Sequence, residues 1–594
     1  MRRPAASLRR PLALAVLLIA GLLGTPTAAG STSHVTPTAA GAPPAAEYTP
    51  RVALIGTAST DGHFRPVGVT PAAGSTSRVS PTAAGAPPTA AFAPRVTPIG
   101  AASAGGRPGG APGAVGHFVP IGSASAEAGY VARTGAPAAP AASGRLSPDG
   151  RRRGLCVDTP LRLTADRPLQ TGASGRIEVH RADGTVADAI DLADPRSYHR
   201  TIGDAVSDTG VLHSFAYHPV LVDGNTATIR LHHRLDYGRT YYVTVDPEVF
   251  PGFPGIQDPA TWRFRTRAAP PRTGSRRLTV AANGRGDFCT VQGAIDFVPE
   301  GNTRPVLIDV RPGTYQEIDY VRADRPHLTV RGAGRDRTVI EYDNNNRLNG
   351  DTALAGSTDP ADVCPRQVLP GHDTFNCWRS LFGVEADDFR LRDITLRNTT
   401  PYGGSQAEAF RGNADRITLR RVTLESFQDT LRLQGRGFVT DSLIAGDVDF
   451  VWGTGSVFVR RTELRSLHGG YVTQARNDAA HPGYVFVDDR LTRGPEAPDA
   501  SVYLGRVDPT VYPASQVVFV RTAMDAHVRP DGWQLNNAGC DKAPDVRFWE
   551  YGSTDLAGRP LDTGARLPCS RRLTDAEAAW WSDPANVLGG WRPR

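Results

Sequence analysis

Two aspartates and two glutamines in the second half of the chain have residue types suited to ester hydrolysis. Gln428 and Asp429 are adjacent, with Gln406 lying 22 residues before Gln428. Asp449 lies 20 residues after Asp429. Two carboxylates held within one strand spacing repel when both are ionised, so the pKa of one should rise. An acid with a raised pKa beside an ionised nucleophile can hydrolyse esters near neutral pH, and the amides add donors for an oxyanion.

These side chains can meet only if the backbone brings them together at a regular interval. A strand-like motif recurs at such an interval, with last residues 28, 20 and 20 positions apart, in Arg392–Leu396, Arg420–Leu424, Thr440–Ile444 and Arg460–Leu464. A repeat of about 20 residues built of short strands is typical of a solenoid. We therefore expect a parallel β-helix with strands about 4.8 Å apart, in which the four polar residues lie on one face.

Six motifs follow one another in the last 317 residues, 278–594. They are Val280–Phe288, Gly313–Glu317, Gln406–Phe410, Gln428–Leu431, Asp449–Gly453 and Leu504–Arg506. In this order they resemble the motifs of the pectin methylesterases (pectinesterases, carbohydrate esterase family 8). The resemblance implies a right-handed parallel β-helix that hydrolyses methyl esters of homogalacturonan, the backbone of pectin, to pectate and methanol. It also implies that no metal or organic cofactor is needed.

The resemblance assigns a role to each polar residue. Asp449 would attack the ester carbonyl, and Asp429 would protonate the departing methanol and then activate water. Gln406 and Gln428 would donate hydrogen bonds to the oxyanion. Arg506 would grip Asp449 and orient it.

The chain also departs from the family's pattern near the expected cleft. Val507–Asp508 stand where the family usually has Pro-Trp, so sugar stacking falls to Trp533, with Phe450 and Trp452 as further substrate contacts. Glu408 replaces an apolar residue, so its carboxylate would either repel galacturonate or point outward. The segment 344–377 has the character of an insertion that could wall the cleft.

The first half of the chain differs in composition from the second. Residues 1–29 have four arginines and a short apolar run, which is typical of a signal peptide. Residues 30–150 contain a Pro/Ala/Gly-rich repeat with a period of 44 residues, expected to be an extended linker. Residues 155–267 alternate apolar and polar positions between turn signals, which favours a small Ig-like β-sandwich. Val291, Ala294, Ile295 and Val298 have helical spacing and predict a helix at one end of the solenoid.

Charge and cysteine content agree with an exported enzyme. Lys and Arg number 66 against 60 Asp and Glu, a mildly basic balance that favours polyanions without the dense cationic runs of nucleic-acid tails. We expect no nucleic-acid or membrane partner, and take a monomer as the default. Six cysteines in an exported chain indicate disulfides, with 15 conceivable pairings. Nearness favours Cys364–Cys377 and Cys540–Cys569, which leaves Cys156–Cys289.

Three other functions remain open from the residues alone. A related esterase or thioesterase would keep the aspartate pair but act on another ester. A non-catalytic wall-binding β-helix would not need the pair. A pectate lyase or polygalacturonase could share the solenoid but does not require this set of Gln, Asp and Arg.

Overall fold

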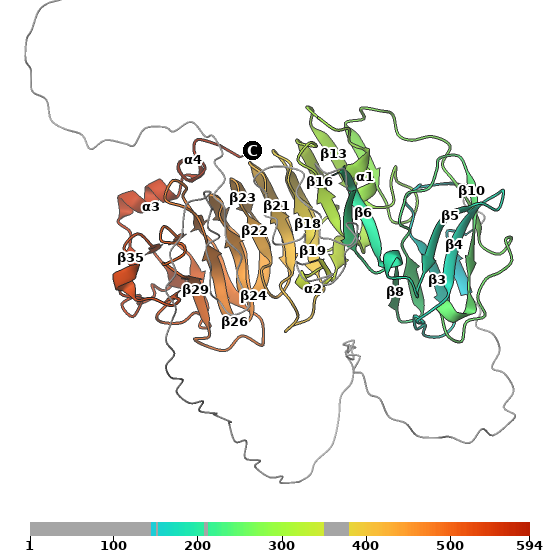
Figure 1. Ribbon diagram of the computed structural model, residues 1–594. Coiled ribbons are helices and arrows are strands. Elements are labelled where there is room, and N and C mark those ends of the chain that lie inside the picture. The colour runs from blue at the N-terminus through green and yellow to red at the C-terminus, as the bar shows by residue number, and fades with distance from the viewer. Residues whose placement is uncertain (1–143, 150–152, 207–211, 350–378, 594) are drawn as a thin grey trace, which may run out of the picture. The chain divides into compact units, whose positions relative to one another are not determined.

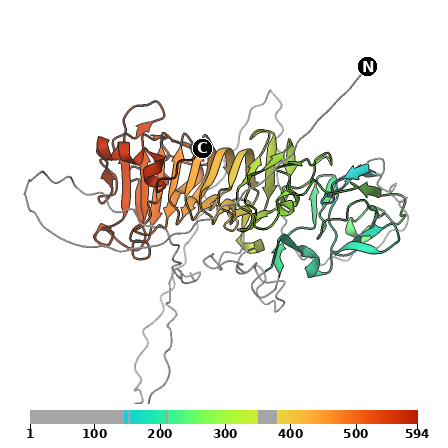
Figure 2. The same ribbon diagram turned by 90° about the horizontal axis from the view of Figure 1, so that it is seen from above.

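The computed structural model describes residues 144–149, 153–206, 212–349 and 379–593 (Figures 1 and 2). The predicted signal peptide, nearly all of the repeat linker, most of the expected insertion and the Cys364–Cys377 pair lie outside these ranges. Within the described part, no helix has the length and apolar content needed to cross a membrane.

The region expected to be a β-sandwich forms two sheets that share one core. Their orders are β1-β3-β9-β8 and β2-β11-β10-β4-β5, and all pairs are antiparallel except β2 with β11. Inward residues of both sheets are fully buried in one cluster, for example Leu163 and Ile229 against Val179 and Val243. The alternation read from the sequence is therefore the alternation between core and solvent. The strands are β1 (Gly144–Ser147), β2 (Arg153–Leu155), β3 (Leu161–Ala165), β4 (Arg176–Arg181), β5 (Val186–Asp191), β8 (Val220–Asp223), β9 (Thr226–Ile229), β10 (Thr240–Val245) and β11 (Arg263–Thr266).

The rest of the described chain is a parallel β-helix. Its 24 described strands, β12 to β35, belong to one continuous sheet whose named strand pairs are parallel. They are β12 (Arg277–Val280), β13 (Val306–Val310), β14 (Gly313–Tyr315), β15 (Asp319–Val321), β16 (Leu328–Arg331), β17 (Thr338–Tyr342), β18 (Ser380–Val384), β19 (Arg390–Asn398), β20 (Glu408–Gly412), β21 (Ile417–Glu425), β22 (Leu431–Leu433), β23 (Gly437–Thr440), β24 (Leu443–Gly453), β25 (Val457–Arg460), β26 (Glu463–Ala475), β27 (Tyr484–Val487), β28 (Arg490–Arg493), β29 (Val502–Val507), β30 (Gln516–Val520), β31 (Ala523–Met524), β32 (Trp533–Leu535), β33 (Arg547–Tyr551), β34 (Thr554–Asp555) and β35 (Arg571–Arg572).

The predicted register of the coils is confirmed. Leu396 pairs with Leu424, Leu424 with Ile444, and Ile444 with Leu464. All four side chains are fully buried in the core of the solenoid. Apolar residues at the same position of successive coils thus stack on one another, which explains why the motif repeats.

Short helices cover parts of the stack. α1 (Val291–Phe297) is the predicted helix; Thr290 caps it by accepting from the Gly293 amide, and Ile295 packs into the core of the first coils. Figure 1 shows α1 beside β13 and β6. Near the C-terminus, Trp581 and Leu588 pack on an outer face of the β-helix. The other elements are β6 (His199–Val206), β7 (Leu212–Ala216), α2 (Asn346–Asn349), α3 (Asp575–Trp581), α4 (Pro584–Val587) and the 3-10 turns η1 (Pro195–Tyr198), η2 (Pro247–Val249) and η4 (Cys540–Lys542).

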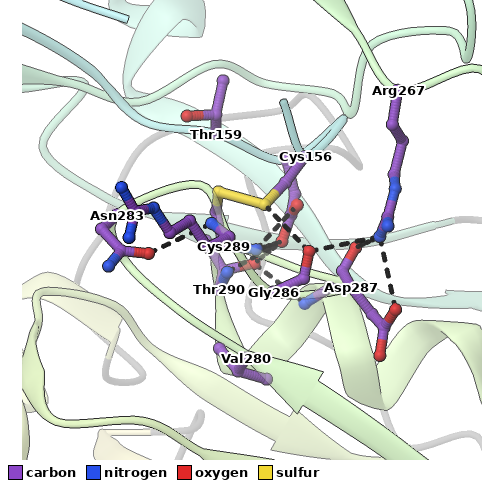
Figure 3. Close-up of a disulfide and its surroundings, with 12 residues drawn as sticks. Cys156, Thr159, Arg267, Val280, Asn283, Gly286, Asp287, Cys289 and Thr290 are labelled. Carbon is purple, nitrogen blue, oxygen red and sulfur yellow. Dashed lines mark hydrogen bonds and ion pairs between the residues drawn. A yellow bond between two sulfur atoms is a disulfide. The ribbon is translucent and has the colours of Figure 1, made fainter. Parts of the chain in front are cut away.

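Two of the expected disulfides are present in the described residues, Cys156–Cys289 and Cys540–Cys569. The first joins the segment before β3 to the residue before the cap of α1 (Figure 3). Asp158 accepts hydrogen bonds from the amides of Cys289 and Thr290 at 3.1 and 2.8 Å. Beside it, Arg267 donates to the Asp287 carbonyl at 2.9 Å. Polar contacts therefore reinforce this covalent link.

Candidate active site

The two aspartates lie on neighbouring strands of the solenoid. A parallel bridge joins Gln428 to Val448, and the Asp429 amide donates to the Val448 carbonyl at 3.0 Å. Asp429 is therefore next to Asp449 across one strand spacing of about 4.8 Å. Both have left-handed backbone conformations, with φ of 70° and 51°, which aspartate tolerates better than most residues. Both side chains are buried.

Arg506 holds the Asp449 carboxylate with two parallel hydrogen bonds. Its Nε lies 2.9 Å from Oδ1 and its Nη2 lies 2.5 Å from Oδ2. The guanidinium carbon is also 4.2 Å from the centre of the Tyr471 ring. Burial lowers the pKa of Arg506, but the hydrogen bonds and charge of Asp449 outweigh it, so the net pKa is raised. The result is a permanently charged fork that fixes the orientation of Asp449.

The surroundings of Asp429, in contrast, favour its protonated form. Burial raises its pKa, and the nearby carboxylates of Asp449 and Glu408 raise it further, while Arg379 and Arg476 act in the other direction. The net result is a pKa of about 7. A carboxyl with this pKa can both give and take a proton near neutral pH, as a general acid and base must.

The two glutamines lie near this pair, Gln428 on the coil of Asp429 and Gln406 on the coil before it. The Gln428 carbonyl accepts from the Ala407 amide at 3.2 Å, which places residue 406 one coil before residue 428. Both glutamines are half-buried, and Gln406 Oε1 accepts from the Ser405 hydroxyl at 3.3 Å. The structure thus brings all five predicted catalytic residues, including Arg506, to the same few coils.

The three expected substrate contacts are buried instead of lining a surface. Trp533 is 1% exposed, stacks on Phe548 with ring centres 4.5 Å apart, and donates to Glu550 at 3.3 Å. An indole enclosed in this way has no face for a sugar ring, which corrects the expectation for Trp533. Phe450 is also fully buried in the core, so it cannot touch a substrate in this structure.

Trp452 is buried among cations. The guanidinium carbons of Arg432 and Arg476 lie 4.4 and 4.7 Å from its ring centre, and that of Arg379 lies 5.4 Å away. Its indole therefore packs these arginines beside the aspartates and presents little surface for stacking on a sugar.

Two residues complete the surroundings of Asp429. Arg379 was not identified from the sequence because it lies 50 residues before Asp429, a distance that is no multiple of the 20-residue period. Its Nη2 donates to Asp429 Oδ2 at 2.5 Å. Glu408 neither points outward nor faces an open cleft: it is 0% exposed and pairs with Arg379 at 3.2 Å. The extra carboxylate thus shares the guanidinium of Arg379 with Asp429.

In the described residues, one group has the geometry for a metal ion, formed by Cys156, Asp158 and Cys289. Its two sulfurs are joined in a disulfide, so they are not thiolate ligands. This group lies away from the aspartate pair in the sequence and in the fold.

Comparison with known proteins identifies the family of the second half of the chain. A family model described as Pectinesterase matches residues 277–362 and 360–570. Pectinesterase 31 of Arabidopsis thaliana is 32% identical over 307 residues, covering 51% of this chain and 90% of that relative. The chain belongs to the pectinesterase family. Pectinesterase 1 of Olea europaea is 29% identical over 312 residues, covering 51% of this chain and 75% of that relative. A solved pectin methylesterase from carrot is 23% identical, covering 54% of this chain and 95% of that chain with a TM-score of 0.44.

Proposed function

We propose that this chain is a secreted pectinesterase that removes methyl esters from homogalacturonan. The observation that carries the proposal is the pairing of two aspartates in different settings. Asp449 is held by the fork of Arg506, while Asp429 has a pKa of about 7. One carboxylate is thereby prepared as a nucleophile and the other as a proton donor.

The reaction proceeds in two halves. A carboxylate oxygen of Asp449 attacks the ester carbonyl carbon, and the side-chain amides of Gln406 and Gln428 donate to the resulting oxyanion. The C–O bond to the methoxy group breaks, Asp429 gives its proton to that oxygen, and methanol leaves. An anhydride then joins Asp449 to the galacturonate carboxyl carbon.

Water completes the cycle. The ionised Asp429 takes a proton from a water molecule, whose oxygen attacks the galacturonate carbonyl of the anhydride. Breaking the anhydride returns Asp449 as a carboxylate and leaves the product as a galacturonic acid carboxyl, while Asp429 is again protonated. The product carboxyl then loses its proton to solvent and becomes pectate. Every proton is accounted for by the two aspartates and water, so this route requires no cofactor.

The wider setting of the proposal follows from composition. Export is supported by the arginine-rich, apolar N-terminus and by cysteines paired in disulfides. The mildly basic chain favours a polyanionic substrate over a neutral one. We propose that the enzyme acts as a monomer outside the cell, with methyl-esterified pectin as its partner.

The first test is methanol release from highly methylated pectin by the oxidised full chain. Wild type should release methanol, and Asp449→Asn should release none while keeping the wild-type circular dichroism and Tm. Asparagine is the better substitution because alanine is strained at φ of 51°. Asp441→Asn, with φ of 55° in a corner away from the site, is the matched control. Near-wild-type turnover in Asp449→Asn would exclude the mechanism.

One observation favours a second candidate, an esterase of the same fold acting on another ester. Trp533 is enclosed in the core, and Val507–Asp508 supply no aromatic side chain for sugar stacking. Methanol release from a small methyl ester but not from pectin would support this candidate, and the reverse would exclude it.

A further inference from the structure

A buried ion-pair network extends from the catalytic pair to the preceding coil. Glu408 begins β20, and its strand pairs with β22, where Phe410 lies opposite Leu431. The Ala409 amide donates to the Thr430 carbonyl at 2.9 Å, which places Glu408 beside Asp429 on the next coil. Three carboxylates, from Glu408, Asp429 and Asp449, therefore occupy adjacent positions in one column of the solenoid.

One arginine connects the first two carboxylates. Arg379, just before β18, is 5% exposed, and its Nη2 donates to Asp429 Oδ2 at 2.5 Å. Its Nε donates to Glu408 Oε1 at 3.2 Å. Because an arginine can only donate, the exchangeable proton of Asp429 belongs on Oδ1, the oxygen that Arg379 Nη2 does not bind.

A glutamate is an unusual residue at the buried position 408. The position is fully buried, where an ionised carboxylate needs close cationic partners to offset lost hydration. Besides Arg379, it has two longer contacts of 3.9 Å, to Arg411 Nε and Arg432 Nη1. An apolar side chain would fill the same space without needing any of these cations. The charge of Glu408 therefore calls for an explanation beyond packing.

We propose that Arg379 and Glu408 are positioning residues that set when Asp429 gives and takes its proton. Arg379 orients the Asp429 carboxyl and stabilises its ionised form after methanol leaves. Glu408 anchors Arg379 and counters part of its charge, so that Asp429 still holds a proton at the start of the cycle. This inference rests on the proposed function, since it concerns the proton carried by Asp429.

Charged groups other than Arg379 and Glu408 also lie near Asp429 and influence its pKa. Asp449 raises its pKa, as Glu408 does, whereas Arg379 and Arg476 lower it. Further cations in these surroundings are Arg506, which is paired with Asp449, and Arg432 and Arg411, which each lie 3.9 Å from Glu408. Changing Glu408 and changing Arg379 should therefore shift the proton affinity of Asp429 in opposite directions against a constant background.

The test is the pH profile of kcat/KM for methanol release from pectin by the full chain. Activity should fall on the alkaline side as Asp429 loses its proton. In Glu408→Gln this alkaline limb should move to lower pH by about one unit, since a neighbouring negative charge is lost and Arg379 is freed for Asp429. In Arg379→Gln it should move to higher pH by about one unit, since the nearest cation is lost.

Controls separate this role from a structural one. Arg461→Gln removes a charge from an exposed ion pair and Glu463→Gln from a half-buried one, both away from Asp429, and should leave the alkaline limb unchanged. Arg379→Lys keeps the positive charge but loses the planar guanidinium that bridges Asp429 and Glu408. The alkaline limb should therefore stay near its wild-type position while kcat falls. If a glutamine variant does not fold, Arg379→Lys and Glu408→Asp test the proposal in its place. Each should lower kcat without moving the alkaline limb.

Folded glutamine variants whose alkaline limb does not move, or whose limbs move in the same direction, would overturn the proposal. So would lysine and aspartate variants with wild-type kcat, where the glutamine variants do not fold. An inactive wild type would instead refute the proposed function, so the two failures can be told apart.

Discussion

Asp429 and Asp449 have the same residue type and similar backbone conformations, yet their side chains meet opposite surroundings. Asp449 receives two hydrogen bonds from one guanidinium. Asp429 shares Arg379 with Glu408 and lies beside Asp449 itself. The proposed division of roles between nucleophile and acid therefore depends on neighbours on other coils.

The raised pKa of Asp429 predicts a pH-dependent cost to stability. Its pKa is 3.8 when unperturbed and about 7 in the folded chain, so the folded state binds the proton more tightly. The stabilisation from this proton is complete below the unfolded pKa and is lost as pH rises through about 7. Asp429→Asn, which cannot ionise, should gain Tm relative to wild type between about pH 5 and about pH 9.

Asp441→Asn is the matched control for this prediction. A hydrogen bond donated by Arg461 lowers the pKa of Asp441, so this carboxylate stabilises the fold above its unfolded pKa. That stabilisation is already fully present at about pH 5 and does not change at higher pH. The Tm difference of Asp441→Asn should therefore stay constant over the same range. A constant difference for Asp429→Asn as well would contradict the raised pKa.

At the scale of the coil, stability comes from apolar side chains that stack on apolar side chains of the neighbouring coils. Ile444 lies between Leu424 and Leu464 on adjacent strands, and all three are fully buried. The outer corners instead carry exposed ion pairs, such as Arg461 with Asp441 at 2.8 Å. Interior apolar contacts should therefore contribute far more than corner charges.

Ile444→Ala tests that difference. The substitution should cost about 2–5 kcal/mol, because it removes buried methyl groups and leaves a cavity between two coils. Arg461→Gln, in the next corner, should cost no more than about 1 kcal/mol. Thermal unfolding of both variants at equal concentration checks this, and similar Tm values for the two would argue against core stacking as the main stabilising term.

At the scale of the molecule, the two disulfides in the described residues close loops of very different length. Cys156–Cys289 joins residues 133 apart in sequence, while Cys540–Cys569 joins residues 29 apart. A cross-link over a longer loop removes more entropy from the unfolded chain. The first disulfide also has Asp158 beside it, which accepts from the two amides that precede α1.

Removing each disulfide should therefore have unequal effects. The double variant Cys156→Ser/Cys289→Ser should lose about 2–5 kcal/mol, and more than Cys540→Ser/Cys569→Ser. The Tm of the two variants, measured without reductant, gives the comparison. A larger loss on removing Cys540–Cys569 would show that local packing, rather than loop length, controls the contribution of each link.

The features that were predictable from the sequence are those that repeat or lie close together in the chain. The 20-residue period gave the pairing of Leu424, Ile444 and Leu464, and the same period placed Asp429 beside Asp449. Periodicity succeeds here because each coil of a solenoid repeats the path of the last, so equal spacing in sequence becomes adjacency in space.

The surroundings of the aspartates were decided by the tertiary structure alone. Whether a side chain in a coil points inward depends on local backbone turns and on coils of unequal length. This is why Trp533 is enclosed in the core and Glu408 is fully buried. Arg379 reaches Asp429 across 50 residues, outside the period that reveals the other site residues. Residue types and spacing thus predicted the candidate catalytic residues, whereas packing across coils decided their ion-pair partners and the raised pKa of Asp429.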